Sequence, residues 1–451
     1  MPIDTMPSTA DEDSAAERRR EQHGWYFYDW ACAVYSTSVL TVFLGPYLTA
    51  VARSAADAHG YVHPFGVAVR AGSFFAYCVS ASVVLAIVLM PLVGAAADRG
   101  GRKKGLLALC AYTGAAATAG MFFLDGTRYL LGGFLLIVAN AAMAVSMVVY
   151  NSYLPQIATP EERDAVSSRG WAFGYGAGAL MLIADLVLYT QHDSFSLSEA
   201  AAVRICLAAA GVWWGAFTLI PLRRLRDRRT AHAAQGPAVH GWRQLAATVR
   251  HMRRTPLTLA FLVAYLIYND GIQTVISQAS IYGSEELGMS QSTLILAVLL
   301  VQVLAVGGAL GMGRLARRYG AKRTILGSLV TWTVILAGGY FLPAHAPVWF
   351  FVLAACIGTV LGGSQALSRS LFSHLVPAGK EAEYFSAYEL SDRGMSWLGP
   401  LLFGLAFQLT GSYRVSIISL VIFFVIGFVL LARVPVRQAV RDAGNPVPEM
   451  I

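Results

Sequence analysis

The chain contains twelve long apolar segments, six before and six after an arginine-rich stretch between Arg223 and Arg254. Segments such as 130–149 and 417–431 carry very few polar side chains. At a rise of about 1.5 Å per residue, roughly twenty such residues cross the hydrocarbon of a bilayer. Because a backbone in lipid must satisfy its own hydrogen bonds, we predict that these segments are membrane-spanning α-helices.

The composition agrees with this prediction, since 56% of the 451 residues are hydrophobic and only 13% are charged. About a quarter of a soluble domain is charged. We therefore predict an all-α integral membrane protein with twelve transmembrane helices in two six-helix bundles. The predicted spans are 24–51, 70–95, 104–124, 128–152, 167–190, 199–222, 256–283, 292–313, 324–342, 347–371, 382–409 and 413–434. The predicted divisions are an N-terminal tail (1–23), a first bundle (24–222), a central loop (223–255), a second bundle (256–434) and a C-terminal tail (435–451).

Basic residues are concentrated in one set of the predicted loops, around 18–20, 99–104, 223–254 and 314–323. An even number of spans places both termini on one side, and the positive-inside rule places that side in the cytoplasm. We expect the plasma membrane as the location. The RRLRDRR segment that starts at Arg223 could also contact nucleic-acid phosphates, but no binding fold or interleaved aromatic residues accompany it. We therefore expect no nucleic-acid partner.

A short segment between spans 2 and 3, GAAADRGGRKK at 94–104, combines one carboxylate with glycines and cations. Glycine lets a chain reverse tightly. An acid at such a turn can bind a helix N-terminus or an arginine and so hold two helices together. A weaker copy, GRLARRYGAKR at 313–323, has Arg317 where the first copy has Asp98. The candidate functional residues of this turn are Gly94, Asp98, Arg99, Gly101 and Arg102.

The segment at 94–104 resembles the signature loop of the major facilitator superfamily. Further motifs resemble its vacuole-effluxer branch: WYFYDWA at 25–31, YNSYLP at 150–155, YNDG at 268–271 and GGSQALSRS at 362–370. The resemblance implies two parallel bundles with a substrate site between them. It also implies that the five residues named at 94–102 form a cytoplasmic gate, in which Asp98 braces the two halves. The second loop has no acid at the matching position. The implied cargo is a small polar solute, amino acids first, and the implied direction is export.

Ionisable residues inside the spans indicate mechanism, because a charge is costly in hydrocarbon. Asp270 lies fourteen residues after Pro256, about 20 Å along span 7. A carboxyl group removed from water can exchange a proton; the alternative is a structural hydrogen bond to a neighbouring helix. Asp29 lies about 7 Å into span 1. The aromatic residues near it favour an interfacial belt, with a gate or proton site as the alternative. They are Trp25, Tyr26 and Trp30.

Span 11 carries Glu389, Asp392 and Arg393 within one helical turn. Glu389 and Arg393 are four residues apart and can form an ion pair. This pairing leaves Asp392 for Arg369 or for a substrate amine; the alternative is neutralisation within the span. Arg169, at the start of span 5, could bind a substrate carboxylate or extend to the lipid headgroups.

Neutral polar residues are further candidates for a substrate cavity, although each could instead bond across helices. They are Tyr35, Asn140, Asn151, Tyr268, Asn269, Gln273, Gln365 and Tyr388. Asp185 lies near the far end of span 5, and we expect its carboxylate to be solvated.

These observations predict a secondary active transporter that works by alternating access and uses a proton gradient. The alternatives are a non-transporting receptor or scaffold on the same fold and a lipid-modifying membrane enzyme. The histidines form no catalytic cluster in the sequence, and no GK[ST] nucleotide loop is present. We therefore expect no enzymatic activity, cofactor or metal. The expected partners are the substrate, protons and the bilayer, and we expect a monomer.

Overall fold

The computed structural model describes residues 9–100, 103–158, 163–227, 255–376, 388 and 397–445. Helices dominate it, as the apolar segments predict. A short antiparallel ribbon joins β1 (Tyr61–Val62) to β2 (Val69–Arg70). The predicted all-α fold class is confirmed, since this ribbon joins only two residues from each strand.

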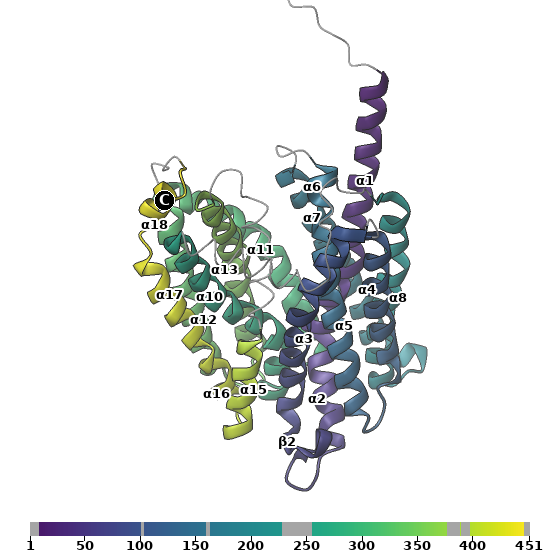
Figure 1. The fold of residues 1–451 in the computed structure, drawn as a ribbon. Helices are drawn as coiled ribbons and strands as arrows, with labels where there is room; N and C mark the ends of the chain where they lie inside the picture. The colour runs from purple at the N-terminus through teal and green to yellow at the C-terminus, as the bar shows by residue number, and fades with distance from the viewer. Residues whose placement is uncertain are drawn as a thin grey trace, which may run out of the picture.

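The first half of the chain forms one group of helices, drawn in purple and blue in Figure 1. Its first span is a continuous helical path from Ala16 to Ser54, longer than the predicted 24–51 and interrupted by a π-helix. The elements are α1 (Thr9–Val34), the π-helix η1 (Tyr35–Phe43), α2 (Leu44–Ser54), α3 (Ala71–Gly100), α4 (Lys103–Gly120), α5 (Tyr129–Asn151), α6 (Leu154–Ile157), α7 (Arg163–Thr190) and α8 (Glu199–Arg224), with short 3-10 turns η2 (Pro64–Gly66), η3 (Met121–Phe123) and η4 (His192–Phe195).

The second half forms the other group, drawn in green and yellow in Figure 1. Pro256 and Pro347 begin two of its helices, at the position where proline's missing N–H costs nothing. Gly411, at φ 72°, ends a third. The elements are α10 (Pro256–Ile281), the π-helix η5 (Tyr282–Glu286), α11 (Gln291–Tyr319), α12 (Ala321–Tyr340), α13 (Pro347–His374), α15 (Leu398–Thr410), α16 (Tyr413–Ser419), α17 (Val421–Arg433) and α18 (Val436–Asp442).

Nine helical segments in the described part of the chain are long and apolar enough to cross a membrane. Helices α11, α12 and α15 occupy the positions of the three other predicted spans. Most of predicted span 11 before α15 lies outside the described residues. The chain is therefore a multi-pass membrane protein.

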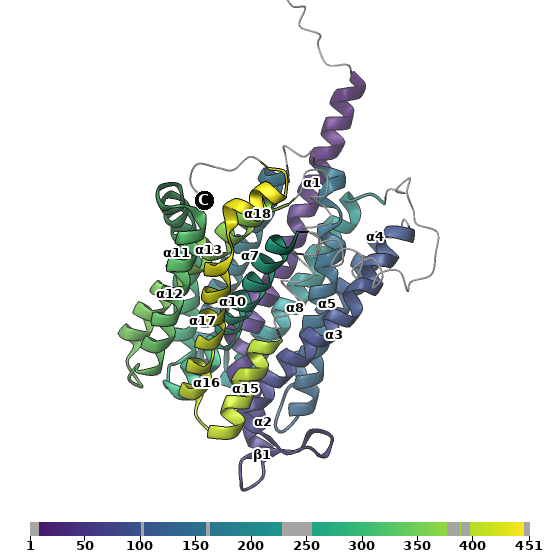
Figure 2. The same ribbon diagram turned by 60° about the vertical axis from the view of Figure 1, so that its left-hand side comes forward.

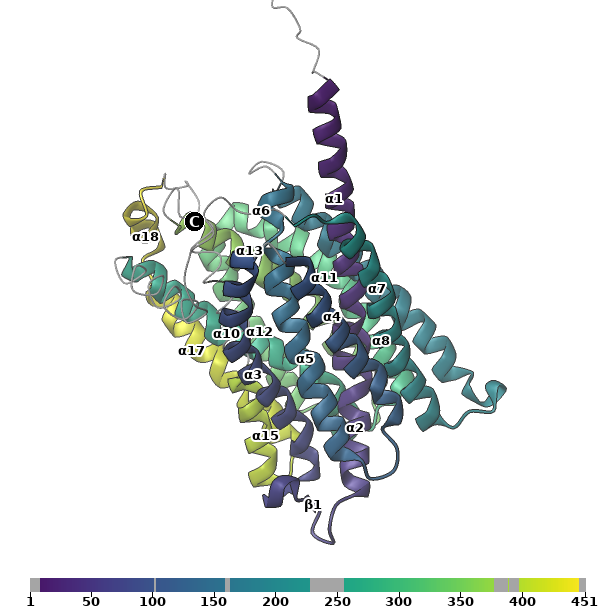
Figure 3. The ribbon, with the colours of Figure 1, turned by 45° about the vertical axis from the view of Figure 1, so that its right-hand side comes forward.

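Both ends of the described chain lie at the same end of the molecule. Helix α1 begins there and α18 finishes there, as Figures 1, 2 and 3 all show. This arrangement is the one that an even number of crossings produces. We call the opposite end, where α2, β2 and α16 lie in Figure 1, the distal end.

Two predicted tails contain helix. Helix α1 already begins at Thr9, inside the predicted tail 1–23. Helix α18 lies within the predicted tail 435–451 and buries Val436, Ala439 and Val440. The Nδ2 of Asn445 donates to the backbone oxygens of His374 and Val376 and so ties this tail to the end of α13.

Candidate functional site

The two halves are joined by polar contacts in the distal part of the molecule, where α3 meets α15 and α16. Most of these bonds run from a side-chain donor to a main-chain oxygen of the other half. They are Ser73 Oγ to Gly404 O (2.9 Å), Ser80 Oγ to Trp397 O (2.9 Å) and Tyr413 OH to Gly72 O (3.0 Å), with Arg70 N donating to Gln408 Oε1 (2.9 Å). We call this set, with the span 1 bonds described next, the distal contact.

The π-helix η1 brings the first span into the distal contact. The Ser280 hydroxyl, at the end of α10, donates to the Thr41 carbonyl. The Gln291 Nε2, at the start of α11, donates to the Val42 carbonyl at 3.2 Å. Wide helical turns of this kind are rare and occur frequently at functional sites. An ion pair between Arg53 of α2 and Glu285 of η5 completes the connection.

Removing the Arg53–Glu285 ion pair should loosen the distal contact. Half of the Arg53 side chain is exposed, so the pair contributes at most about 1 kcal/mol. We expect Arg53→Ala to speed maleimide labelling of Ser73→Cys about fivefold, measured in nanodiscs with Cys110 and Cys356 replaced by serine. Ser73 is fully buried in the closed contact.

The exchanged pair, Arg53→Glu with Glu285→Arg, should restore slow labelling. Glu286→Gln is the matched control, because Glu286 pairs with Arg414 of its own half at 2.9 Å. Equal labelling rates in the Arg53→Ala protein and its parent would show that the ion pair does not hold the halves together.

Asp29 lies against a glycine of α7 and beneath an aromatic cluster. A Cβ on Gly170 would lie 2.6 Å from Asp29 Oδ2, and the Tyr150 hydroxyl donates to the same oxygen at 2.7 Å. Trp25 stacks on Tyr150 at 4.3 Å and donates its Nε1 to the Tyr150 carbonyl. Trp25 and Tyr26 are only 2% and 3% exposed. The prediction of an interfacial belt was therefore wrong, because these rings pack the bundle interior.

Asp270 lies on the first span of the second half, farther along its span than Asp29 lies along span 1. Its side chain is 2% exposed, and its Oδ2 accepts the backbone N–H of Gly399 at 2.9 Å. A Cβ on Gly399 would lie 3.0 Å from Asp270 Oδ1 and 1.9 Å from Thr274 Oγ1. Among the described residues, Oδ1 has no hydrogen-bond partner. The structural hydrogen bond to a neighbouring helix, which was the alternative to a proton site, is therefore present. It uses only one of the two carboxylate oxygens.

The two acidic sites have the same kind of neighbour. In each half, a carboxylate on the first span faces a glycine on the fifth predicted span, Asp29 against Gly170 and Asp270 against Gly399. Only a residue without a side chain lets the carboxylate approach the neighbouring backbone so closely. The two pairs lie at different depths, about 7 Å and about 20 Å along their spans, so they have the same kind of partner without being equivalent positions.

Several predicted cavity residues bond or pack within their own half. Asn140 donates to Ser82 Oγ at 2.7 Å, and the Tyr268 and Ser368 hydroxyls are 2.5 Å apart. Tyr35 is fully buried and packs on Trp214, and Tyr388 stacks on Tyr265 at 4.5 Å. Asn269 is buried too, whereas the remaining candidates are half-buried: Asn151, Gln273 and Gln365.

Two of the predicted arginines, Arg169 and Arg369, are exposed. Arg369 of α13 acts electrostatically on the Tyr175 hydroxyl of α7, in the other half. The cluster Glu389, Asp392 and Arg393 lies outside the described residues.

The predicted gate segment is more helical than a tight turn. Helix α3 continues through Gly100 and α4 begins at Lys103. Gly94, Asp98 and Arg99 therefore lie on the last turns of α3. The other two gate residues, Gly101 and Arg102, lie outside the described part of the chain.

Asp185 contradicts its prediction, because it is 2% exposed rather than solvated. The Ser38 hydroxyl donates to its Oδ2 at 2.5 Å. The sequence shows only that Asp185 is near the end of an apolar segment. It does not show that the π-helix turns Ser38 toward α7.

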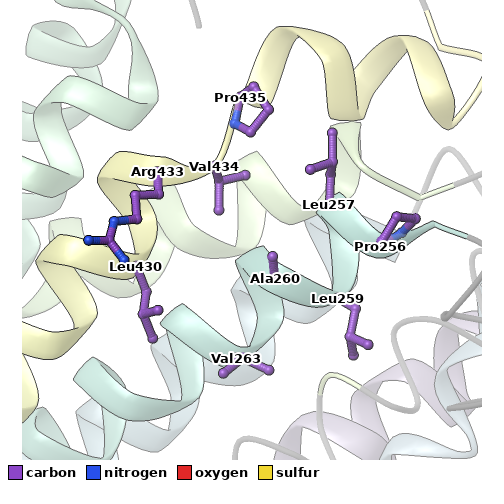
Figure 4. Close-up of a pocket in the computed structure, with 9 residues that line it drawn as sticks. All are labelled: Pro256, Leu257, Leu259, Ala260, Val263, Leu430, Arg433, Val434 and Pro435. Carbon is purple, nitrogen blue, oxygen red and sulfur yellow. The ribbon is translucent and has the colours of Figure 1, made fainter.

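An apolar groove of about 400 Å³ lies between the beginning of α10 and the end of α17 (Figure 4). Arg433 is its one charged lining residue. None of the predicted site residues lines this groove, so it is separate from the two carboxylate sites. Its lining is Pro256, Leu257, Leu259, Ala260, Val263, Leu430, Arg433, Val434 and Pro435.

Comparison with known proteins gives extensive matches. A family model described as "Vacuole effluxer Atg22 like" matches residues 17–444. The MFS-type transporter YxiO of Bacillus subtilis (strain 168) is 31% identical over 435 residues, which cover 95% of this chain and 98% of that protein. Autophagy-related protein 22-1 of Penicillium rubens is 26% identical over 558 residues, which cover 97% of this chain and 93% of that protein.

Solved structures share the fold. A mutant of the nucleoside transporter NupG matches with a TM-score of 0.66 at 16% identity, covering 92% of this chain and 98% of that one. The xylose transporter XylE from E. coli, in an inward open conformation, matches with a TM-score of 0.62 at 12% identity, covering 94% and 96%. At these identities the likeness concerns the fold alone, and it confirms the predicted major facilitator architecture.

Proposed function

The chain belongs to the vacuole effluxer Atg22-like family of MFS-type transporters, and on this premise we propose that it exports a small polar solute in exchange for, or together with, protons. Amino acids are the first class of cargo to test. The two bundles, 24–222 and 256–434, rock about the substrate site and expose it alternately to each side of the membrane. The end that carries both termini faces the cytoplasm, and the membrane is the plasma membrane.

The observation that supports proton coupling is the Asp270 carboxyl. It is buried within a bundle, its described partner is the neutral N–H of Gly399, and one of its oxygens is free among the described residues. Such a group is costly as a charge in hydrocarbon and is usually functional. The free oxygen is the place where a proton would bind.

The support for an amino-acid cargo is chemical and comes from both halves. The exposed guanidinium groups of Arg169 and Arg369 offer planar donors for a carboxylate. The carboxylate of Asp29, which is only partly buried, offers an acceptor for an amine. A zwitterion is the small solute that would use both.

The test measures solute flux into proteoliposomes under an imposed pH step. The solutes are a panel of amino acids, with a sugar and a nucleoside as controls. We expect saturable flux of at least one amino acid that collapses when a protonophore is added. Flux that ignores both the pH step and the protonophore would contradict proton coupling. Binding without flux would instead favour the receptor or scaffold alternative.

A further inference from the structure

A second buried carboxyl, Asp185, lies inside the first half, away from both carboxylate–glycine sites. It sits on α7, its hydrogen-bond donor is the Ser38 hydroxyl of η1, and the Cys206 thiol of α8 interacts with it electrostatically. Ser38 and Cys206 are 0% exposed. Three helical elements therefore meet at one ionisable group that the proposed transport mechanism does not use.

Only neutral partners face this carboxyl. The described groups that act on it are Ser38 and Cys206, and Cys206 is the titratable one. Helix α11 carries no charged residue between Gln291 and Gly313, and α6 carries none. On the other packed elements, Asp29 of α1 bonds with Tyr150, Glu199 of α8 with Tyr189, Arg204 of α8 with Asp125, and His192 of η4 with Asp193. The remaining charged residues of α1, at 11–23, and of α8, Arg223 and Arg224, lie toward the opposite end of these helices. A carboxylate charge at this place would be uncompensated, and such charges are costly in hydrocarbon.

The π-helix connects this carboxyl to the distal contact. Ser38 binds Asp185, and three residues later on the same turn the Thr41 carbonyl accepts from Ser280 of the second half. The next residue, Val42, accepts from Gln291. A shift of η1 relative to α7 must therefore move both acceptors of the cross-half bonds.

We propose that Asp185 is a second proton-binding site, whose proton sets the position of η1 and thereby the distal contact. With the proton bound, the carboxylic acid and the Ser38 hydroxyl form a neutral hydrogen bond and η1 stays docked on α7. When the proton leaves to water, the remaining charge draws water into the bundle, η1 shifts and the cross-half bonds weaken. Asp185 acts through η1, so it is a positioning residue. The inference rests on the proposed alternating access, but not on the cargo or on Asp270.

Two measurements on the purified full-length chain in nanodiscs test the proposal without a substrate. The first is the infrared difference spectrum of a pH step, in which a buried carboxylic acid gives its own C=O stretching band. We expect one component of that band to vanish in Asp185→Asn and to remain in Asp270→Asn. The second is maleimide labelling of Ser73→Cys, with Cys110 and Cys356 replaced and the buried Cys206 retained.

In the parent protein we expect labelling to accelerate about fivefold as the pH is raised, which is the effect of losing about one net hydrogen bond. Asp185→Asn should label slowly at every pH, because the amide keeps the bond to Ser38 and carries no proton to lose. Ser38→Ala should keep the infrared component and lose the pH dependence of labelling. This variant therefore separates proton binding at Asp185 from the effect of that proton on the distal contact.

Labelling that stays pH-dependent in Asp185→Asn would overturn the proposal. So would the absence of an Asp185 component in the infrared spectrum, since Asp185 would then be a purely structural hydrogen-bond partner. Loss of pH-driven flux in Asp270→Asn tests the proposed coupling site instead and leaves this inference untouched.

Discussion

Proteoliposomes that contain Asp270→Asn should show no pH-driven flux, although the protein remains folded and inserted. Asparagine has the shape of aspartate, and its side-chain oxygen can still accept the Gly399 N–H that Asp270 Oδ2 accepts at 2.9 Å. The amide cannot bind and release a proton, so the step that uses the gradient is lost. We expect flux under a pH step to fall to the level of empty vesicles.

Counterflow separates this loss of coupling from loss of folding. With substrate on both sides and no pH step, Asp270→Asn should still exchange its cargo, because exchange needs the rocking motion and not the proton. Asp193→Asn is the matched control, since Asp193 is an almost fully exposed acid in η4. Undiminished pH-driven flux in Asp270→Asn would remove Asp270 from the coupling mechanism.

A large loss of stability is expected from Gly211→Ala. A Cβ on Gly211 of α8 would lie 2.3 Å from the backbone nitrogen of Ala119 and 2.7 Å from the backbone oxygen of Ala115, both on α4. Main-chain atoms in a helix cannot rotate away, so the two helices must separate along their contact. We expect a loss of at least about 3 kcal/mol, at the upper end of what overpacking costs, with most of the protein failing to elute as a monodisperse species.

Gly215→Ala, one turn later on the same helix, is the matched control. Its new Cβ would lie 3.6 Å from the Ala115 side chain, which is ordinary van der Waals contact. We expect this variant to keep or slightly raise the melting temperature, since alanine favours a helix over glycine by up to about 1 kcal/mol. Equal melting temperatures for the two variants would show that α4 and α8 can move apart freely.

The membrane fold was predictable from the sequence because each apolar segment is long enough to identify a helix without its neighbours. Asp29 and Asp270 could also be identified from the sequence as candidate functional residues, because an ionisable side chain is unusual in an apolar segment. Their partners were not predictable. Gly170, Gly399 and Tyr150 come from other helices, and only the packing brings them within reach.

Asp185 and η1 show where local reasoning fails. The position of Asp185 near the end of its span suggested solvent, yet another span covers it with Ser38. The Thr41 and Val42 carbonyls of the π-helix accept hydrogen bonds from the other half, and their partners are 239 and 249 positions away in the chain. A window of neighbouring residues contains no information about such contacts.

Most hydrogen bonds of the distal contact depend on the identity of the donor residue and not on that of the acceptor residue. Ser73, Ser80 and Tyr413 each donate a side-chain hydroxyl to a carbonyl of the peptide chain in the opposite half. Every amino acid supplies such a carbonyl, so the hydrogen bond itself sets no residue type at the accepting position; Gly72 and Gly404 are restricted only by space, since a Cβ there would lie 2.4 Å from Phe407 and 2.8 Å from Tyr77. Evolution can therefore retune how firmly this transporter closes by exchanging single hydroxyl-bearing residues, one bond at a time, without a compensating change on the other side.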